Sequence, residues 1–349
     1  MIVNNEYDKL RKCIVGREFN LSDKMFDLSF RVFFQNNLED LDYCRAFEKE
    51  YTNEVIQERN EDLDNLAKVL ESHGVEVLRP KVTDKVIDVK TPTFKSICRP
   101  SSNVRDLTFV YNKTIIETAP SLTGRFFENY WLYDVFKDLF DNHDYNWIQV
   151  PKSFLSDDVI DTEDWQRDRD FTDIDQFDMF FDAANALKFN DFILYNYSSA
   201  NHFKGIKWLE KNLRVPIIPV KITDNHIDGN IVSLNENTIL VNDKHLNKRI
   251  EELLPEQFKD FNILRLPDNI ELETDMSDFD LPHLASKDGM SINVLSIDKK
   301  TVVVNKDDTV VCDLLDKNGF NVVPVQLRYC RAFGGGIHCS TLDVERTDE

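Results

Sequence analysis

Short runs rich in β-branched and aromatic residues alternate with amphipathic helical stretches along most of the chain. Four segments share one order: two strand-like runs joined by a tight turn, then a helical stretch, then a short third run. These segments cover residues 106–150, 181–220, 226–266 and 291–325. Asn, Asp and Lys residues occupy the turns, as hairpin geometry favours. The pattern predicts a repeated unit of hairpin, helix and strand, with helices over 126–141, 201–213, 244–254 and 307–317.

The two ends of the chain supply the pieces of a fifth unit. Residues 337–343 predict one strand of a hairpin and residues 12–16 predict the other, while a helix over 45–73 and a strand over 75–78 complete the unit. The helix is expected to serve core packing alone. A ring closed by its own chain ends leaves no open sheet edge.

The expected fold is therefore α/β: five ββαβ modules in an α/β propeller with pseudo-five-fold symmetry. Residues 1–349 would form a single domain. At roughly 150 residues per domain, the length alone would suggest two domains. The alternative is an ordinary α/β sheet in which the similarity of the segments is accidental.

Composition and charge narrow the class of function. The 42 Lys and Arg residues against 63 Asp and Glu residues leave a net charge of −21, which argues against a nucleic-acid partner. No run approaches the roughly 18 apolar residues of a membrane span, and the N-terminus shows no targeting pattern. The six cysteines have no CxxC spacing, as expected for reduced thiols. We expect a cytoplasmic protein without a membrane partner.

The ring would bring the starts of the first strands together around its axis. Carboxylate, imidazole and thiol groups would meet there, an unusual collection that predicts a functional site. The residues at these starts are Asp106, Asp182, His226 with Asp228, the Ala285-Ser286 region, and His338 with Cys339.

Such carboxylates indicate a cationic ligand. Burying each carboxylate costs several kcal/mol unless a positively charged group binds it. A hard divalent metal suits a neighbouring thiolate poorly, whereas a planar guanidinium binds carboxylates through paired hydrogen bonds. We expect neither a metal nor a cofactor. Cys339 would attack the central guanidinium carbon, and His226 would carry the proton. Asp228, two residues further along a strand, would share the face of His226.

Each of these residues also has an ordinary structural alternative. Asp106 could cap a turn, and His226 could be a satisfied core or loop histidine. Asp182 lies among apolar residues, where an unpaired charge would be costly. Cys339 follows Gly334–Gly336, which holds three of the chain's 10 glycines and allows positive φ or a close approach of the backbone to a ligand. That run is too short for a phosphate-binding glycine motif, so a nucleotide site is not expected.

Together these motifs resemble the arginine-dependent amidinotransferases, the group of the glycine and inosamine-phosphate enzymes. The resemblance covers nearly the whole chain, and that family's fold is an α/β propeller of five ββαβ modules. The motifs that carry it are Asn5–Asp8, Ile14–Gly16, Arg105-Asp106, Arg125–Glu128, Phe181–Ala184, His226–Asp228, Ser291–Val294 and Gly334–Cys339.

The resemblance implies a ping-pong transfer between small molecules. Cys339 would take the amidino group of arginine as a covalent amidino-cysteine, ornithine would leave, and an acceptor amine would receive the group. His226 would protonate the departing amine and later deprotonate the acceptor, with Asp182 positioning His226. Asp106 and Asp228 would hold the guanidinium. Family members are often dimers, so a homodimer is an expectation, although no segment identifies an interface.

The sequence departs from the family pattern where the donor carboxylate would bind. An arginine usually stands there, and here Lys244 and His245 are the substitutes; Ser286 matches a binding serine, but Ala285 replaces its usual neighbour. The acceptor amine therefore stays open. Two alternatives remain: a hydrolase on the same scaffold, as in arginine deiminases and dimethylarginine hydrolases, and a catalytically idle ring that binds a cationic ligand or a protein.

Overall fold

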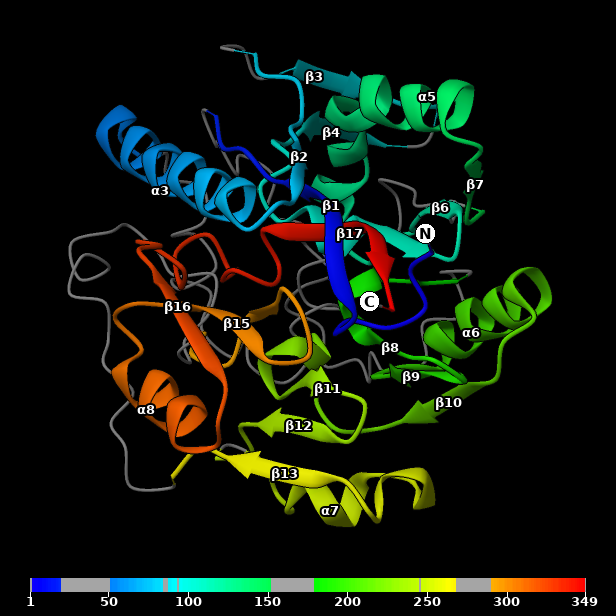
Figure 1. Cartoon of the computed structure of the whole chain (residues 1–349). Coiled ribbons are helices and arrows are strands. Elements are labelled where there is room, and N and C mark those ends of the chain that lie inside the picture. Colours follow the sequence, from blue (N-terminus) through cyan, green and yellow to red (C-terminus); the bar gives the residue numbers. More distant parts are fainter. Residues whose placement is uncertain are drawn as a thin grey trace.

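The computed structural model describes residues 2–19, 51–83, 87–92, 94–151, 179–244, 246–267 and 290–348. These residues form a mixed α/β structure with five three-stranded sheets and one two-stranded sheet. Figure 1 shows the longer helices toward the outside and the strands toward the middle.

Four of the three-stranded sheets follow the predicted order along the chain. In each, the first two strands form an antiparallel hairpin, and a crossover that contains a helix brings the third strand parallel to the second. The strands are β5 (Thr108–Tyr111), β6 (Thr114–Glu117), β7 (Asn146–Gln149), β8 (Ala186–Phe189), β9 (Phe192–Asn196), β10 (Ile217–Val220), β11 (Ile231–Asn235), β12 (Thr238–Val241), β13 (Asn262–Arg265), β14 (Leu295–Ser296), β15 (Thr301–Asn305) and β16 (Asn321–Val325). The crossover helices are α5 (Tyr133–Asn142), α6 (Ala200–Leu213), α7 (Ile250–Leu253) and α8 (Thr309–Lys317).

The fifth three-stranded sheet joins the two ends of the chain. Strand β17 (Thr341–Thr347) pairs antiparallel with β1 (Lys9–Val15), which pairs parallel with β2 (Glu76–Leu78) after helix α3 (Asn53–Ser72). The predicted pairing of the two chain ends is thus confirmed. The additional hairpin of β3 (Ile87–Lys90) and β4 (Lys95–Cys98) was not predicted.

Apolar clusters join each three-stranded sheet to the next. In β5, Phe109 packs toward the sheet of β8–β10, while its neighbour Val110 packs toward β1 and β17. Adjacent strand residues point to opposite faces, so these strands are apolar on both sides. Further clusters join β8–β10 to β11–β13, β11–β13 to β14–β16, and β14–β16 to β1. Closure into a propeller with pseudo-five-fold symmetry stays a prediction at this point.

The polar residues expected at strand starts lie instead in short helical turns that precede the strands. Asp106 belongs to α4 (Val104–Leu107), and Asp182 precedes the 3-10 turn η5 (Ala183–Asn185). His226 precedes the 3-10 turn η6 (Ile227–Gly229), which contains Asp228. The expectation that His226 and Asp228 share one face of a strand is therefore wrong. A hydrogen bond from Asn230 N to Ile227 O, 2.8 Å long, closes the turn.

The predicted and observed elements differ in length. The helix predicted over 126–141 is α-helical only in α5, after the 3-10 turn η3 (Glu128–Leu132), and the helix predicted over 45–73 begins at Asn53, while residues 45–50 lie outside the described residues. Two further elements are much shorter than expected. The helix predicted over 244–254 is reduced to α7, because the buried Asp243 carboxylate accepts a hydrogen bond from Ile250 N (3.1 Å) at the start of α7, and the described residues 246–248 before it form bends. The strand predicted over 291–297 is reduced to β14, because residues before it turn through a hydrogen bond from Asn293 N to Met290 O (3.0 Å).

None of the helices in the described ranges is long and apolar enough to cross a membrane.

Two deeply buried ion pairs lie at the junction of β17 and α4. Asp343 is 0% exposed and accepts hydrogen bonds from Arg105 Nη2 (2.6 Å) and Arg346 Nε (2.9 Å). Burial would raise the pKa of Asp343, but the two guanidinium groups hold the pKa well below its ordinary value. This carboxylate therefore stabilises the fold above its unfolded-state pKa of about 3.9, and the contribution is lost as the pH falls below that value.

Asp343→Asn tests this junction. We expect the free energy of unfolding to fall by about 3–5 kcal/mol near neutral pH, because two buried arginines lose their charged partner. Denaturant unfolding measures the change. Asp313→Asn is the control, since Asp313 pairs only with the exposed Lys317, and it should cost less than about 0.5 kcal/mol. Equal losses in the two variants would contradict the assignment.

Candidate functional site

Cys339 lies in the turns just before β17 and is 1% exposed. Its Sγ is 3.1 Å from Asp228 Oδ2 and accepts a hydrogen bond from Asn293 Nδ2, also at 3.1 Å. The backbone N–H of Cys339 donates to Asn293 Oδ1 at 3.0 Å. A single asparagine thus binds both the thiol and the backbone of the cysteine, which fixes the direction of the thiol.

The glycine run before Cys339 has a separate structural reason at each position. Gly334 has a φ of +61°, in the left-handed region that favours glycine. A Cβ on Gly335 would lie 2.1 Å from Asn103 Oδ1, and a Cβ on Gly336 would lie 2.7 Å from the Cβ of Asn293. The positive φ agrees with the expectation, whereas the close approach was expected toward a ligand. The close approach is to asparagine side chains of the protein.

A buried arginine on α3 also binds the loop that carries Cys339. Arg59 is 0% exposed and donates hydrogen bonds to Arg328 O (2.8 Å), Gly335 O (2.9 Å) and Ser340 Oγ (3.1 Å). Its last two partners lie on either side of Cys339. The expectation that this helix serves core packing alone is therefore wrong, because its buried guanidinium anchors the loop that carries the thiol.

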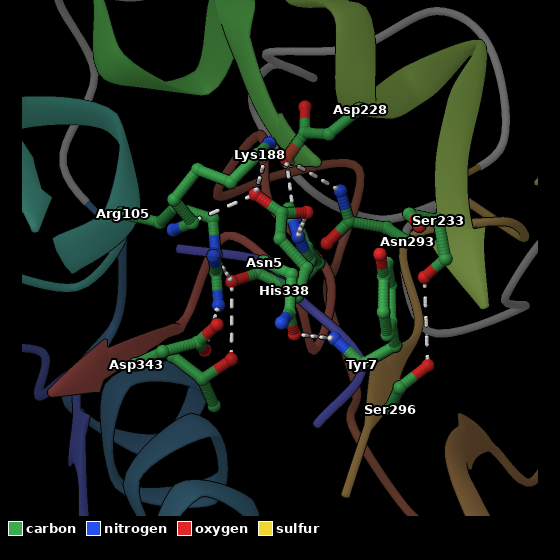
Figure 2. Close-up of polar contacts among 12 residues, drawn as sticks. Asn5, Tyr7, Arg105, Lys188, Asp228, Ser233, Asn293, Ser296, His338 and Asp343 are labelled. Atoms are coloured by element: carbon green, nitrogen blue, oxygen red, sulfur yellow. Dashed lines mark hydrogen bonds and ion pairs between the residues drawn. The ribbon is translucent and has the colours of Figure 1, made fainter. Parts of the chain in front are cut away.

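Asp228 is the carboxylate that touches the thiol. It is 1% exposed, and its Oδ2 accepts hydrogen bonds from His338 Nδ1 (2.9 Å) and Asn293 Nδ2 (3.2 Å) (Figure 2). Burial alone would raise its pKa, but the hydrogen bond and charge of His338 outweigh burial and lower the pKa to about 2.

The pKa of the Cys339 thiol is shifted upward, opposite to the pKa of Asp228. Burial raises the pKa of Cys339 well above its usual value, and the negative charges of Asp228 and Asp106 raise it further. The ligand-free protein therefore carries a neutral thiol at neutral pH. A cation placed beside the two carboxylates would lower that pKa.

Asp106 is held by an arginine of the protein itself. Arg125 Nη1 donates to Asp106 Oδ2 at 2.7 Å, while Arg125 Nε and Nη2 bind the two oxygens of Glu128 at 2.9 and 3.0 Å. His226 Nδ1 lies 3.8 Å from the same Asp106 oxygen. The other oxygen, Oδ1, is buried and has no hydrogen-bond partner among the described residues. Burial raises the pKa of Asp106, and Arg125 and His226 offset part of the rise.

Asp182 lies next to a second histidine. Its Oδ2 accepts a hydrogen bond from Ser121 Oγ (3.3 Å) and is 3.8 Å from His202 Nε2. Burial would raise the pKa of Asp182, but the neighbouring His202 ring and the charge of His226 lower it below its ordinary value. Asp182 is therefore ionised at neutral pH, and it lies close enough to His226 for the two side chains to interact electrostatically.

The short turns bring these side chains together. α4 contacts η5, and η5 contacts η6, so that Asp106, Asp182 and Asp228 come from three neighbouring turns. Of the other expected residues, Lys244 is exposed just after β12. His245 and Ser286 lie outside the described residues.

Several residues of the site were not singled out from the sequence. Asn293, Arg125 and Glu128 were noted only within motifs, while Arg59 and His202 were noted only within predicted helices. The one local signal was the three-residue spacing of Arg125 and Glu128, which suits an ion pair on a helical turn. The other contacts join segments far apart in the chain, such as Arg59 to Ser340.

In the described part of the chain, no three His, Cys, Asp or Glu side chains are grouped so that they could hold a metal ion.

Comparison with known proteins gives consistent matches, although no family model matches the chain. Inosamine-phosphate amidinotransferase 1 of Streptomyces griseus is 31% identical over 350 residues, which cover 99% of this chain and 96% of the relative. The mitochondrial glycine amidinotransferase of Xenopus tropicalis is 28% identical over 360 residues, covering 98% of this chain and 82% of the relative.

Solved structures agree with these matches. The structure of the S. griseus inosamine-phosphate amidinotransferase superposes with a TM-score of 0.82 at 28% identity, and the match covers 99% of this chain and 97% of that one. A dimethylarginine dimethylaminohydrolase (DDAH) from Pseudomonas aeruginosa, solved as a cysteine-to-serine variant with citrulline, gives a TM-score of 0.57 at 12% identity and covers 96% of this chain and 99% of that one. The second match shows a shared fold alone.

The thiol pKa offers a direct test of the site geometry. Asp228→Asn removes the negative charge nearest the thiol, so we expect the pKa of Cys339 to fall by roughly one to three units. The pH dependence of alkylation by iodoacetamide, followed by mass spectrometry on the peptide that contains Cys339, measures the change. Asp313→Asn is the exposed control and should leave the profile unchanged. A Cys339 pKa that stays the same or rises in Asp228→Asn would rule out the arrangement.

Proposed function

The chain belongs to the amidinotransferase family, and we propose that it moves the amidino group of arginine through Cys339 to an amine acceptor. The observation that carries the proposal is the buried thiol 3.1 Å from the Asp228 carboxylate, in a site with a second carboxylate, Asp106, whose buried Oδ1 has no hydrogen-bond partner among the described residues. A guanidinium suits both features of the site, since its N–H groups donate hydrogen bonds to carboxylates and its central carbon can be attacked by a thiolate.

The donor guanidinium would lie between Asp106 and Asp228. Arg125 already occupies Oδ2 of Asp106, which leaves the buried Oδ1 to accept a hydrogen bond from the ligand. Asp228 would present its remaining acceptor capacity on the side of the thiol. The positive charge brought by the donor lowers the pKa of Cys339, so that donor binding and formation of the thiolate occur together.

In the first half of the reaction, the Cys339 thiolate forms a C–S bond to the guanidinium carbon. The bond from that carbon to the side-chain nitrogen of ornithine then breaks, and His226 gives the departing nitrogen the proton that the thiol released. Ornithine leaves as an amine, and an amidino group stays on the sulfur.

In the second half, an acceptor amine attacks the same carbon. His226 removes a proton from the amine, a new C–N bond forms, and the C–S bond breaks to return the thiolate, which recovers a proton when the product leaves. We assign Asp182 and Asp106 the task of holding His226 in position. Their negative charges would also stabilise the imidazolium that forms in each half.

The donor carboxylate would bind near the end of β12. Lys244, His245 and Ser286 stay our proposed ligands there, with a lysine point charge in place of a bidentate arginine. The relatives named above differ in the compound that their names state, glycine in one and an inosamine phosphate in the other. For this chain we propose an amine acceptor and leave its class to a screen of amino acids, diamines and amino sugars.

We also propose that the five three-stranded sheets form one ring, a five-module propeller that makes residues 1–349 a single domain. The support is the succession of apolar clusters, each shared by two sheets and the last returning to β1. The sheet of β17, β1 and β2, built from both chain ends, would close the ring.

A covalent adduct provides the main test. Incubation with arginine alone should add the mass of one amidino group to the intact protein, and the adduct should disappear when an acceptor amine is added. Cys339→Ser should form no adduct, whereas Cys312→Ser, which alters a partly exposed cysteine on α8, should behave as the wild type. Absence of an adduct with arginine and related guanidines would favour the idle ring.

Product analysis separates transfer from hydrolysis. Ornithine that accumulates continuously only when an amine acceptor is present supports transfer. Citrulline formed from arginine without any amine would instead establish a hydrolase on this scaffold.

His226→Asn tests the proton carrier. We expect kcat/KM for transfer to fall about 10²–10⁴-fold while the unfolding temperature stays unchanged, because Asn has no titratable group to exchange protons. His143→Asn alters an exposed histidine after α5 and serves as the control. Wild-type activity in His226→Asn would refute the acid–base assignment.

A further inference from the structure

The Asn293 side chain directs all of its polar atoms at the site of the thiol. Asn293 lies just before β14 and is 3% exposed. Its Nδ2 lies 3.1 Å from Cys339 Sγ and 3.2 Å from Asp228 Oδ2, and its Oδ1 accepts the backbone N–H of Cys339 at 3.0 Å. Figure 2 shows the contact with Asp228. Among the described residues, the side chain makes no hydrogen bond outside the site.

The orientation of the amide follows from the backbone of Cys339. A backbone N–H only donates hydrogen bonds, so the Asn293 atom that faces it is the carbonyl oxygen. The NH2 group then faces Cys339 Sγ and Asp228 Oδ2. It carries two N–H bonds, one for each of these acceptors. With oxygen and nitrogen exchanged, two donors would meet at the backbone, and an acceptor would face the carboxylate.

The position of the amide is constrained as well. Asn293 O accepts the backbone N–H of His338 at 3.1 Å, and Asn293 N donates to Met290 O at 3.0 Å. A Cβ on Gly336 would lie 2.7 Å from the Cβ of Asn293, so the loop that carries Cys339 packs directly against this side chain. The donor is therefore in place at the sulfur before any reaction begins.

The NH2 group bridges two atoms that would become negative together. In the ligand-free protein, the Cys339 thiol donates its hydrogen to Asp228 Oδ2 at 3.1 Å. When the thiol loses its proton, an anionic sulfur faces an anionic carboxylate. Asn293 donates to both atoms, and among the described residues it is the one hydrogen-bond donor to Sγ. Burial and Asp228 raise the pKa of Cys339, and the hydrogen bond from Asn293 opposes that rise.

We propose that Asn293 is a catalytic residue that stabilises the anionic sulfur of Cys339, both as the nucleophile in the first half of the reaction and as the leaving group in the second. This inference rests on the amidino transfer proposed above.

The hydrogen bond would act on the bond that forms and breaks at sulfur. In the first half, the thiolate electron pair forms the C–S bond, the C–N bond to ornithine breaks, and that nitrogen takes a proton from His226. In the second half, the acceptor nitrogen forms a C–N bond and gives a proton to His226, and the electron pair of the C–S bond returns to sulfur. An N–H bonds an anionic sulfur more strongly than a neutral thiol or a sulfur bonded to carbon. The contact therefore lowers the barrier of both halves.

Asn293→Ala removes the donor. We expect the rate constant for formation of the amidino adduct at saturating arginine to fall about 10–100-fold, as for loss of a hydrogen bond to a charged group. Rapid quenching followed by intact-mass measurement gives the rate constant. Asn60→Ala is the matched control, because the Asn60 amide also bonds backbone groups through both ends, those of Glu18, and should leave the rate constant unchanged. A wild-type rate constant in Asn293→Ala would overturn the proposal.

Arginine binding without the sulfur separates an effect on the thiolate from an effect on the shape of the site. We compare the Kd for arginine of Cys339→Ala with that of Cys339→Ala combined with Asn293→Ala, by calorimetry. The two values should agree within about threefold, because Asp228 keeps its hydrogen bond to His338 (2.9 Å). An affinity that falls as far as the rate constant would show that Asn293 only shapes the site, contrary to the proposal.

Asn293→Asp provides a second variant of the same size. Its carboxyl group keeps an oxygen for the Cys339 backbone N–H. Its second oxygen, either ionised or protonated toward Asp228, gives the sulfur no donor. Adduct formation should therefore be at least as slow as in Asn293→Ala. A wild-type rate constant would show that shape and the backbone hydrogen bond suffice, and would refute a contact with the anionic sulfur.

Alkylation by 2-chloroacetamidine tests the contact without amidino transfer. This compound carries an amidinium beside an alkylating carbon, so the thiolate of Cys339 forms a C–S bond and chloride leaves. The rate constant should again fall about 10–100-fold in Asn293→Ala, while that of Cys312 on α8 stays unchanged. If the wild type forms no adduct with arginine, the proposed function fails, and the alkylation rates alone decide the contact. Equal rates in the two proteins would overturn it.

Discussion

The structure of the site depends on one buried negative charge, the Asp228 carboxylate. Such a charge costs several kcal/mol to remove from water unless donors surround it. The donors are the imidazole of His338, the amide of Asn293 and the thiol of Cys339, and they come from turns more than sixty residues away in the chain. Asp228 therefore requires that η6, the turn before β14 and the turn before β17 meet, and the packing of the sheets brings them together.

The backbone around the thiol follows from that requirement. Asn293 can reach both the backbone and the sulfur of Cys339 only if Gly336 carries no side chain, since a Cβ would lie 2.7–3.1 Å from three Asn293 atoms. A glycine-rich loop is flexible, and holding it in one conformation costs entropy. Arg59 offsets part of this cost through hydrogen bonds to groups on both sides of Cys339. The long helix α3 is thus part of the support of the site.

The sequence predicts the sheets better than the site. The alternation of strand-forming residues and the turn residues identify the β5–β6 hairpin. The pairing of β1 with β17 follows because the two chain ends hold the strands that a fifth copy of the repeat requires. Both signals are local or periodic along the sequence. The turn at Ile227–Gly229 was predicted as strand, since it directly precedes the apolar run that forms β11. The roles of Asn293 and Arg59 could not be predicted, because a hydrogen bond between residues 46 or 276 positions apart depends on packing that no local pattern encodes.

The charge balance of the site also constrains the proposed cycle. Without a ligand, the carboxylates keep the thiol protonated, so a neutral electrophile would meet a weak nucleophile. A guanidinium supplies the missing positive charge and the electrophilic carbon at once. The amidino group left on the sulfur would itself be a cation, so Asp106 and Asp228 would still have a positively charged partner after ornithine leaves. The acceptor must then attack as a neutral amine, because an ammonium has no lone pair and would add a second positive charge. The second half of the proposed cycle therefore needs a base that is separate from these carboxylates, which is the role proposed for His226 near Asp106 and Asp182.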